Sequence, residues 1–275
     1  MTANPIHFVH LTDLHISHPE TCDPHLLTDT PATLRQVVDA LGRLSPKPAF
    51  VVVSGDITNH GDAASYRLAR EIMSKIDVPI VYALGNHDNR MAFRAEMLGL
   101  ADGGGAPYCH DQLIAGVHVI VLDSSVPGRI SGAISPDQFA FLEQALTLRT
   151  DFPKLLVIHH PPALEDDPEF RWESINPADT RRLADALRGH RVVGILSGHT
   201  HFDRVIHWNG VPVIVGTGLH NGVDITYSDG MRIVDAAGYA LCTLRPSGLS
   251  AVFVQLERNR RELAILPAER LRAFE

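Results

Sequence analysis

Five short polar motifs in the sequence contain the side chains that bind divalent metal ions in many proteins. They are Asp13-Leu14-His15, Gly55-Asp56, Gly85-Asn86-His87-Asp88, His159-His160-Pro161-Pro162 and Gly198-His199-Thr200-His201. Carboxylate oxygen, amide oxygen and imidazole nitrogen form a mixed ligand set that suits Mn, Fe, Co or Zn rather than a thiolate-bound structural zinc. Seven such ligands are too many for one ion with an open position, but they fit two ions about 3.5–4 Å apart that share a carboxylate. The candidate ligands are Asp13, His15, Asp56, Asn86, His159, His199 and His201.

Each motif directly follows one of six apolar runs that predict buried strands. The runs are Ile6–Leu11, Ala49–Ser54, Ile80–Leu84, Val117–Leu122, Lys154–Ile158 and Val192–Ser197. Apolar residues with helical spacing lie between them, in Pro31–Leu44, Ala63–Ile76, Pro136–Leu148 and Pro177–Leu187. Ser135 and Asn176 precede the last two helices and are suitable N-caps. Strands that alternate with helices predict an α/β fold, and uninterrupted apolar runs suit sheets that are covered on both faces.

The position of the motifs predicts that they meet. In open α/β sheets, ligands bind beyond the carboxyl ends of the strands. Asp13 and His15 are two residues apart, as are His199 and His201. In near-extended backbone, residues at that spacing point to the same side, so each pair can offer two ligands to one site.

The last third of the chain has a different pattern. Phe202–Trp208 and Val211–Val215 flank Asn209-Gly210, which is a strong hairpin signal, and Gly238–Leu244 with Leu249–Leu256 predicts a second hairpin. We expect these antiparallel strands to form a second sheet packed against the first. The tail, Glu257–Glu275, is charged and amphipathic and is expected to form a short helix.

Composition excludes several classes of protein. The chain has 275 residues and a net charge of −8, from 24 Lys and Arg against 32 Asp and Glu. This charge argues against a nucleic-acid surface, where Lys and Arg neutralise phosphates. No apolar run approaches the roughly 20 residues of a membrane-spanning helix, and no basic and apolar leader opens the chain. Cys22, Cys109 and Cys242 are far apart and odd in number, which favours free thiols. We therefore expect a cytoplasmic protein with no nucleic-acid or membrane partner.

Taken together, the D-x-H, G-D, G-N-H-D, H-x-P-P and G-H-x-H motifs resemble those of the calcineurin-like metallophosphoesterases, from about Ile6 to about Val215. The stretch Gly55–Gly61 and the G-H-T-H form are most similar to bacterial class III cyclic-nucleotide phosphodiesterases and to related glycerophosphodiesterases. The resemblance implies a four-layer αββα sandwich of two mixed sheets flanked by helices, with a dinuclear metal site at the strand ends. It also implies one domain over residues 1–275, in which the late hairpin and tail, 231–275, form a small cap or an oligomerisation element.

The resemblance further implies a role for each motif residue. Asp13, His15 and His201 would hold one metal ion, Asn86, His159 and His199 the other, and Asp56 would bridge both. His87 resembles the family histidine that faces the phosphate without binding metal, so Asn86 and His87 are also the candidate substrate-binding residues and His87 is the candidate catalytic residue. Attack by a metal-bound hydroxide on phosphorus would follow, with His87 either protonating the leaving alkoxide or stabilising the phosphoryl oxygens.

The expected activity is hydrolysis of a small phosphodiester, either a 3′,5′-cyclic nucleotide or a glycerophosphodiester. A phosphomonoesterase or nucleotidase with the same metal core is the alternative, and a non-catalytic scaffold or a nuclease is a weaker one. Loops at Pro19–Thr30, Leu164–Ile175 and His220–Asp235 are expected to form the pocket walls. His160 is expected to support the ligands or to be structural, and Asn59 and His60 fit either a supporting role or plain turn chemistry. His220-Asn221-Gly222 fits either contact with substrate or turn chemistry. A homodimer or higher homo-oligomer is compatible with the late hairpins and the tail.

Overall fold

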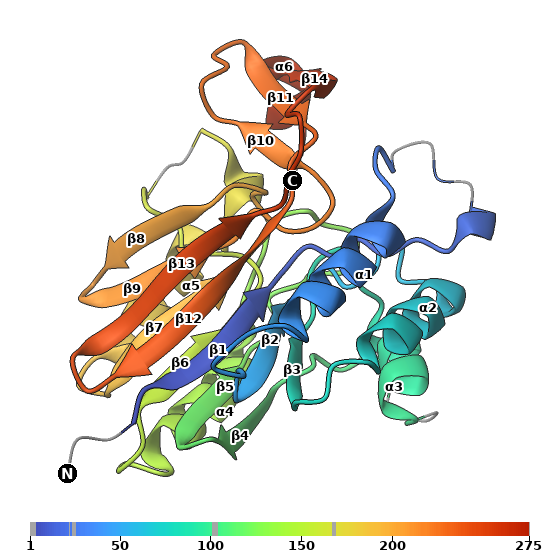
Figure 1. Cartoon of the computed structure of the whole chain (residues 1–275). Helices are drawn as coiled ribbons and strands as arrows, with labels where there is room; N and C mark the ends of the chain where they lie inside the picture. Colours follow the sequence, from blue (N-terminus) through green and yellow to red (C-terminus); the bar gives the residue numbers. More distant parts are fainter. Residues whose placement is uncertain (1–3, 22, 24–25, 101–103, 167–168, 275) are drawn as a thin grey trace.

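A computed structural model describes residues 4–21, 23, 26–100, 104–166 and 169–274 of the chain, and it contains two large mixed sheets (Figure 1). The first has the strand order β13 (Gly248–Gln255), β12 (Gly238–Arg245), β1 (Ile6–Leu11), β2 (Phe50–Ser54) and β3 (Ile80–Ala83). The second has the order β4 (His110–Ile114), β5 (Val117–Val121), β6 (Lys154–Val157), β7 (Val192–Ser197), β9 (Val211–Val215) and β8 (Arg204–Trp208). Within each sheet, the strands that precede the motifs run parallel to one another.

Helices cover the outer face of each sheet. The helices α1 (Thr30–Leu41), α2 (Ala63–Met73) and α3 (Arg90–Leu98) share a hydrophobic core with the first sheet. The helices α4 (Pro136–Thr147) and α5 (Pro177–Leu187) share another core with the second sheet. A third apolar cluster, which includes Phe8, Val119 and Val157, lies between the two sheets. This arrangement confirms the predicted αββα layers and two mixed sheets flanked by helices.

The helices begin where capping chemistry predicts. The Ser135 side chain accepts a hydrogen bond from the Gln138 backbone N–H, and Asn176 accepts one from Asp179. These bonds satisfy amide groups that the first turn of a helix leaves without partners. Both N-caps predicted from the sequence are confirmed.

The prediction for the late hairpins is only partly correct. Both hairpins form, but they do not make a sheet of their own: β8 and β9 extend the second sheet, and β12 and β13 extend the first. The predicted parallel strands are likewise divided, with β1 to β3 in one sheet and β5 to β7 in the other. Strand patterns identify strands but not their neighbours, because pairing between distant segments leaves no local signal.

A small third sheet stands at one end of the sandwich (Figure 1). It consists of β10 (Gly222–Asp224), β11 (Gly230–Val234) and β14 (Glu262–Pro267), followed by the short helix α6 (Ala268–Arg272). The expectation of a helical tail is therefore wrong over Glu262–Pro267, where pairing with β11 holds the chain extended. The predicted cap at 231–275 overlaps this unit only in part, because β12 and β13 belong to the first sheet.

The described residues bear on two further expectations. None of their helices combines the length and the apolar character that crossing a bilayer would require. Cys109 and Cys242 are free thiols, as expected, whereas Cys22 lies outside the described residues. Assembly into a homo-oligomer and the single-domain organisation stay predictions.

Candidate metal centre

The loops that follow β1 and β2 are joined by backbone hydrogen bonds. The N–H groups of Asp13 and His15 donate to the carbonyl oxygens of Gly55 and Asp56, at 3.1 and 2.9 Å. Asp13, His15 and Asp56 have left-handed backbone, with φ of 48°, 43° and 51°. The extended geometry assumed for the D-x-H pair is therefore wrong, although both of its side chains still reach one site. Left-handed backbone costs a residue with a side chain roughly 1–2 kcal/mol, and such strain concentrates at functional sites.

The same geometry recurs after β7. His199 and His201 have φ of 75° and 55°, and the His199 backbone N–H donates to both carboxylate oxygens of Asp13, at 3.1 and 3.0 Å. A third connection comes from the loop after β3. There the His87 backbone N–H donates to Asp56 Oδ1 at 2.9 Å. The strand-end motifs are therefore tied together across both large sheets.

Two fully buried carboxylates lie at the middle of this cluster. Asp56 Oδ2 lies 3.2 Å from His159 Nε2 and 3.6 Å from His15 Nε2. Asp13 Oδ1 lies 3.4 Å from His201 Nε2, 3.9 Å from His15 Nε2 and 4.0 Å from His159 Nε2. Each carboxylate thus faces imidazole nitrogens from other strand ends, as the sequence predicted.

The tautomers of two histidines follow from their hydrogen bonds. His15 Nδ1 lies 2.8 Å from Asn59 Oδ1, and His159 Nδ1 lies 2.9 Å from the Ser54 carbonyl oxygen. Because these oxygens only accept, the proton lies on Nδ1 and each Nε2 keeps a free lone pair. The Asn59 amide nitrogen in turn donates to Asp23, which fixes the amide orientation. Asn59 therefore supports the site, which the sequence left open.

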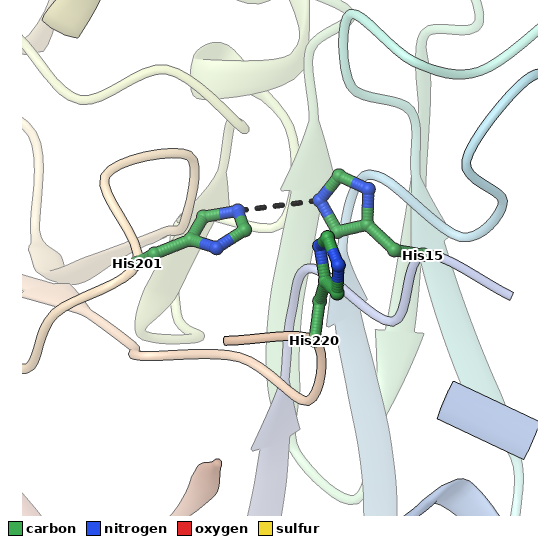
Figure 2. A group of neighbouring side chains, drawn as sticks. All are labelled: His15, His201 and His220. Carbon is green, nitrogen blue, oxygen red and sulfur yellow. Dashed lines mark hydrogen bonds between the residues drawn. The ribbon is translucent and has the colours of Figure 1, made fainter. Parts of the chain in front are cut away.

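The two histidines of the G-H-x-H motif are held by opposite nitrogens. His201 Nδ1 donates to Asn221 Oδ1 at 2.9 Å, so Nε2 of the neutral ring carries the lone pair and lies 3.2 Å from His15 Nε2 (Figure 2). His199 Nε2 donates to the Trp172 carbonyl oxygen at 2.6 Å, which leaves Nδ1 free. An oxygen partner that fixes the ring orientation is what metal-binding histidines use elsewhere in proteins.

Several buried polar atoms of the site have no hydrogen-bond partner among the described residues, and two of them belong to predicted metal-binding residues. These two are His159 Nε2 and Asn86 Oδ1. An unpaired buried polar atom costs about 1–3 kcal/mol, so such atoms indicate a missing partner. Both are lone-pair donors, and the ligand atoms of Asp13, Asp56 and His159 all lie within 4.8 Å of one another. The residues present therefore fit a bound cation.

The electrostatics of the cluster favour positive charge among its buried side chains. Burial raises the pKa of the Asp56 carboxyl, but the imidazoles of His159 and His87 outweigh it and hold this pKa well below its usual range. Burial lowers the pKa of the His159 ring, but the Asp56 and Asp13 carboxylates more than offset this and raise it to about 9. A high imidazole pKa beside two carboxylates means that this pocket stabilises positive charge, which a metal ion would supply in place of the proton.

Two further histidines differ in what their nitrogens contact. His160 Nδ1 bonds Ser124 Oγ at 2.7 Å and Nε2 donates to the Ile130 carbonyl oxygen at 2.8 Å, which agrees with the structural role predicted for it. His220 lies beside His15 and His201, with its ring close to both (Figure 2).

The orientation of His220 follows from Asn221. Asn221 Oδ1 accepts from His201, so the amide nitrogen of Asn221 donates to His220 Nδ1, at 3.0 Å. His220 Nδ1 is therefore an acceptor, and the proton of this ring lies on Nε2. Nε2 is buried and has no partner among the described residues. Burial, and to a smaller extent the nearby ring of His201, lowers the pKa of His220 to about 3. The ring is therefore neutral, and its Nε2–H is a hydrogen-bond donor. The sequence did not decide this role, because His220-Asn221-Gly222 also reads as a turn.

An open cavity of about 670 Å³ lies over the cluster and is lined in part by Asp56, Asn86 and His87. Each of the three predicted loops contributes, through Leu27, Trp172 and His220 among others. Sequence reasoning missed another part of the lining, which includes Ala264 and Leu266 of β14 and Phe274 beyond α6. The sequence of the tail predicts a helix and gives no indication that this segment lies at the site.

Comparison with known proteins identifies the class. A sequence profile of the calcineurin-like phosphoesterases matches residues 6–203, so the chain belongs to this family of phosphoester hydrolases. A probable cyclic nucleotide phosphodiesterase of Rhodococcus erythropolis is 34% identical over 78% of this chain and 71% of its own length. A probable glycerophosphodiester phosphodiesterase of Arcobacter nitrofigilis is 31% identical over 63% of this chain and 64% of its own length.

A solved structure shares the fold. It is a dimetal phosphatase from Danio rerio, which superposes with a TM-score of 0.65 at 16% identity over 92% of this chain and 99% of the other. The family and fold expected from the motifs are therefore confirmed.

Proposed function

We propose that the chain is a metal-dependent phosphodiesterase that hydrolyses a small phosphodiester, either a 3′,5′-cyclic nucleotide or a glycerophosphodiester. The observation that carries the proposal is the convergence of lone-pair donors from five strand ends, with His159 Nε2 and Asn86 Oδ1 left without partners. The names of the two bacterial relatives support the choice of a diester substrate.

Two divalent or trivalent ions of Fe, Mn, Zn or Co are the proposed cofactors. Asp13, His15 and His201 would hold one, Asn86, His159 and His199 the other, and Asp56 would bridge them. When bound, such a pair lowers the pKa of coordinated water toward neutrality and offsets negative charge on a phosphoryl group.

The chain's own residues position the substrate and move a proton. The His87 side chain is exposed, and its Nδ1 donates to the Asn59 carbonyl oxygen at 2.8 Å. Nε2 is then left for the substrate, and when protonated it can donate to a phosphoryl oxygen or to the leaving alkoxide. The Nε2–H of His220 is a second donor for a phosphoryl oxygen. The carboxylate of Asp56 accepts a hydrogen bond from the His87 backbone N–H, which fixes the position of the His87 Cα atom beside the metal-binding cluster.

A hydrolysis panel with added Mn²⁺ tests the proposal. It compares bis-p-nitrophenyl phosphate, p-nitrophenyl phosphate, cyclic AMP, cyclic GMP and glycerophosphoethanolamine at equal concentration. We expect diesters to be hydrolysed faster than monoesters and the activity to disappear after chelation. Faster hydrolysis of the monoester would instead indicate the phosphomonoesterase alternative, and turnover that survives complete chelation would refute the metal mechanism.

A further inference from the structure

One face of the small third sheet is built from aliphatic side chains only. The strand register places Val223 opposite Ile233, Ile233 opposite Ala264, and Met231 opposite Leu266. Residues directly opposite one another on neighbouring strands point to the same face. All five side chains line the cavity over the metal-binding cluster, and we call them the aliphatic wall.

The opposite face of the same sheet carries the charged residues, although Ile265 lies there too, across from Arg232. Arg232, which lies between two wall residues in β11, forms ion pairs with Asp224 at 3.3 Å and with Glu262 at 3.5 Å. Its guanidinium also lies 4.2 Å from the centre of the Tyr227 ring. The ion pairs of Arg232 therefore lie on the face of the sheet opposite the aliphatic wall.

The wall and the metal-binding cluster belong to one continuous space. The cavity of about 670 Å³ is lined by Asp56 and His87 of the cluster, by the wall, and by further residues that include Arg270. Phe274 connects the two parts, because its ring lies 6.2 Å from that of Trp172, whose carbonyl oxygen holds His199. A phosphoryl group at the cluster would therefore extend one of its ester groups toward the wall.

Resting on the proposed function, we propose that the preferred substrates are phosphodiesters in which one alcohol carries an alkyl or acyl chain, and that the aliphatic wall binds this chain. The wall side chains are only partly buried, so a chain laid against them removes apolar surface from water on both sides. They offer no hydrogen-bonding group for a sugar hydroxyl or the edge of a nucleobase. The wall lies beyond residue 203, where the family match ends.

A series of p-nitrophenyl alkyl phosphates tests this inference. The methyl, butyl and octyl diesters share a leaving group and a charge, so the chemical step is held constant while the chain grows. The substrates are used with Mn²⁺ below the concentrations at which they form micelles. Each methylene that the wall buries is worth about a two- to fourfold gain in kcat/KM. We therefore expect the butyl ester to exceed the methyl ester by on the order of tenfold.

Two variants show where the gain arises. Ile233→Ser in the wall is expected to reduce the butyl-to-methyl ratio at least threefold. Ile225→Ser is the matched control, because Ile225 is 70% exposed, belongs to the same unit and does not line this cavity. It is expected to leave the ratio unchanged. A ratio near one in the parent protein, or an equal ratio in Ile233→Ser, would overturn the inference.

A binding measurement separates this inference from the proposed function. Calorimetry with O-methyl, O-butyl and O-octyl methylphosphonate, which carry the charge of a diester, reports affinity without turnover. If the methyl diester is hydrolysed but neither rate nor affinity rises with chain length, the wall proposal fails and the phosphodiesterase proposal stands. If affinity rises while no diester is hydrolysed, the wall proposal stands as a ligand preference and the catalytic proposal fails.

Discussion

Gly85→Ala tests whether Asp56 and His159 hold metal. A Cβ atom on Gly85 would lie 2.7 Å from His159 Cδ2 and 2.7 Å from the Asp56 backbone nitrogen, and it would also overlap Asp56 Oδ1. Ordinary contact begins at 3.4 Å, so the neighbours must move by about 0.7 Å. Metal–ligand distances are held within about 0.2 Å, so this displacement exceeds what the site tolerates.

We expect the variant to fold but to bind metal weakly. Overpacking of this kind costs about 1–3 kcal/mol, or roughly 2–12 °C in melting temperature for a chain of this size. Metal affinity should fall about 10- to 100-fold, the range found when groups around a metal site are disturbed. The assays are metal content after dialysis, activity as a function of Mn²⁺ concentration, and thermal unfolding.

The matched control is Gly105→Ala. No atom lies within 4 Å of the Cβ position at Gly105, so the added methyl group meets open space. It should leave metal content and activity unchanged. Full metal content with full activity in Gly85→Ala would refute the assignment of Asp56 and His159 as metal-binding residues.

Three further predictions concern single side chains. His87→Ala should lower kcat about 10²–10⁴-fold for a diester with an alkoxide leaving group and far less for a p-nitrophenyl diester, because only the alkoxide needs a proton as it leaves; equal losses on both would exclude proton donation. Asn59→Leu removes the oxygen that orients His15 and should weaken metal binding about 10- to 100-fold in a Mn²⁺ titration, with recovery of activity at saturating metal. Burial lowers the pKa of His10 to about 4, so below about pH 6.5 the unfolded chain binds more protons than the folded one. The free energy of unfolding of the metal-free protein should therefore fall by about 2 kcal/mol between pH 7 and pH 5 through this residue. His10→Gln should lack that component in urea titrations at the two pH values, and an identical pH dependence in both proteins would contradict it.

The parts of the fold that sequence could predict are those with local causes. Continuous apolar runs such as Val192–Ser197 identify strands because most of their residues are buried, and the last four residues of this strand are all buried. The caps at Ser135 and Asn176 are similarly local, since side chain and amide lie three residues apart. Convergence of the metal-binding motifs followed from parallel strands having their carboxyl ends at one edge.

The parts that could not be predicted depend on contacts between distant segments. The nine-residue helix α3, Arg90–Leu98, is shorter than the window of about 11–18 residues over which a helical period is recognised. The strand β14 exists because it pairs with β11, and its own sequence, Glu262–Pro267, carries charge beside apolar residues as an amphipathic helix would. The left-handed backbone at Asp13 has the same origin, because a hydrogen bond to Gly55 on the next strand end stabilises it.

Catalysis and selectivity are therefore encoded in different parts of the chain. The predicted metal-binding residues lie between Asp13 and His201, within the family match, and hydrogen bonds between strand ends fix their geometry. The aliphatic wall follows that region and contacts the cluster through the shared cavity, through Phe274 against Trp172, and through the Val223 backbone N–H, which donates to the His201 carbonyl oxygen at 2.9 Å. Because the wall shares no hydrogen bond with the carboxylates of Asp13 or Asp56 among the described residues, substitutions in it should change which ester is bound while metal affinity is retained. A family match based on the metal-binding motifs therefore identifies the reaction class. The alcohol group of the substrate has to be identified from the residues that follow the matched region.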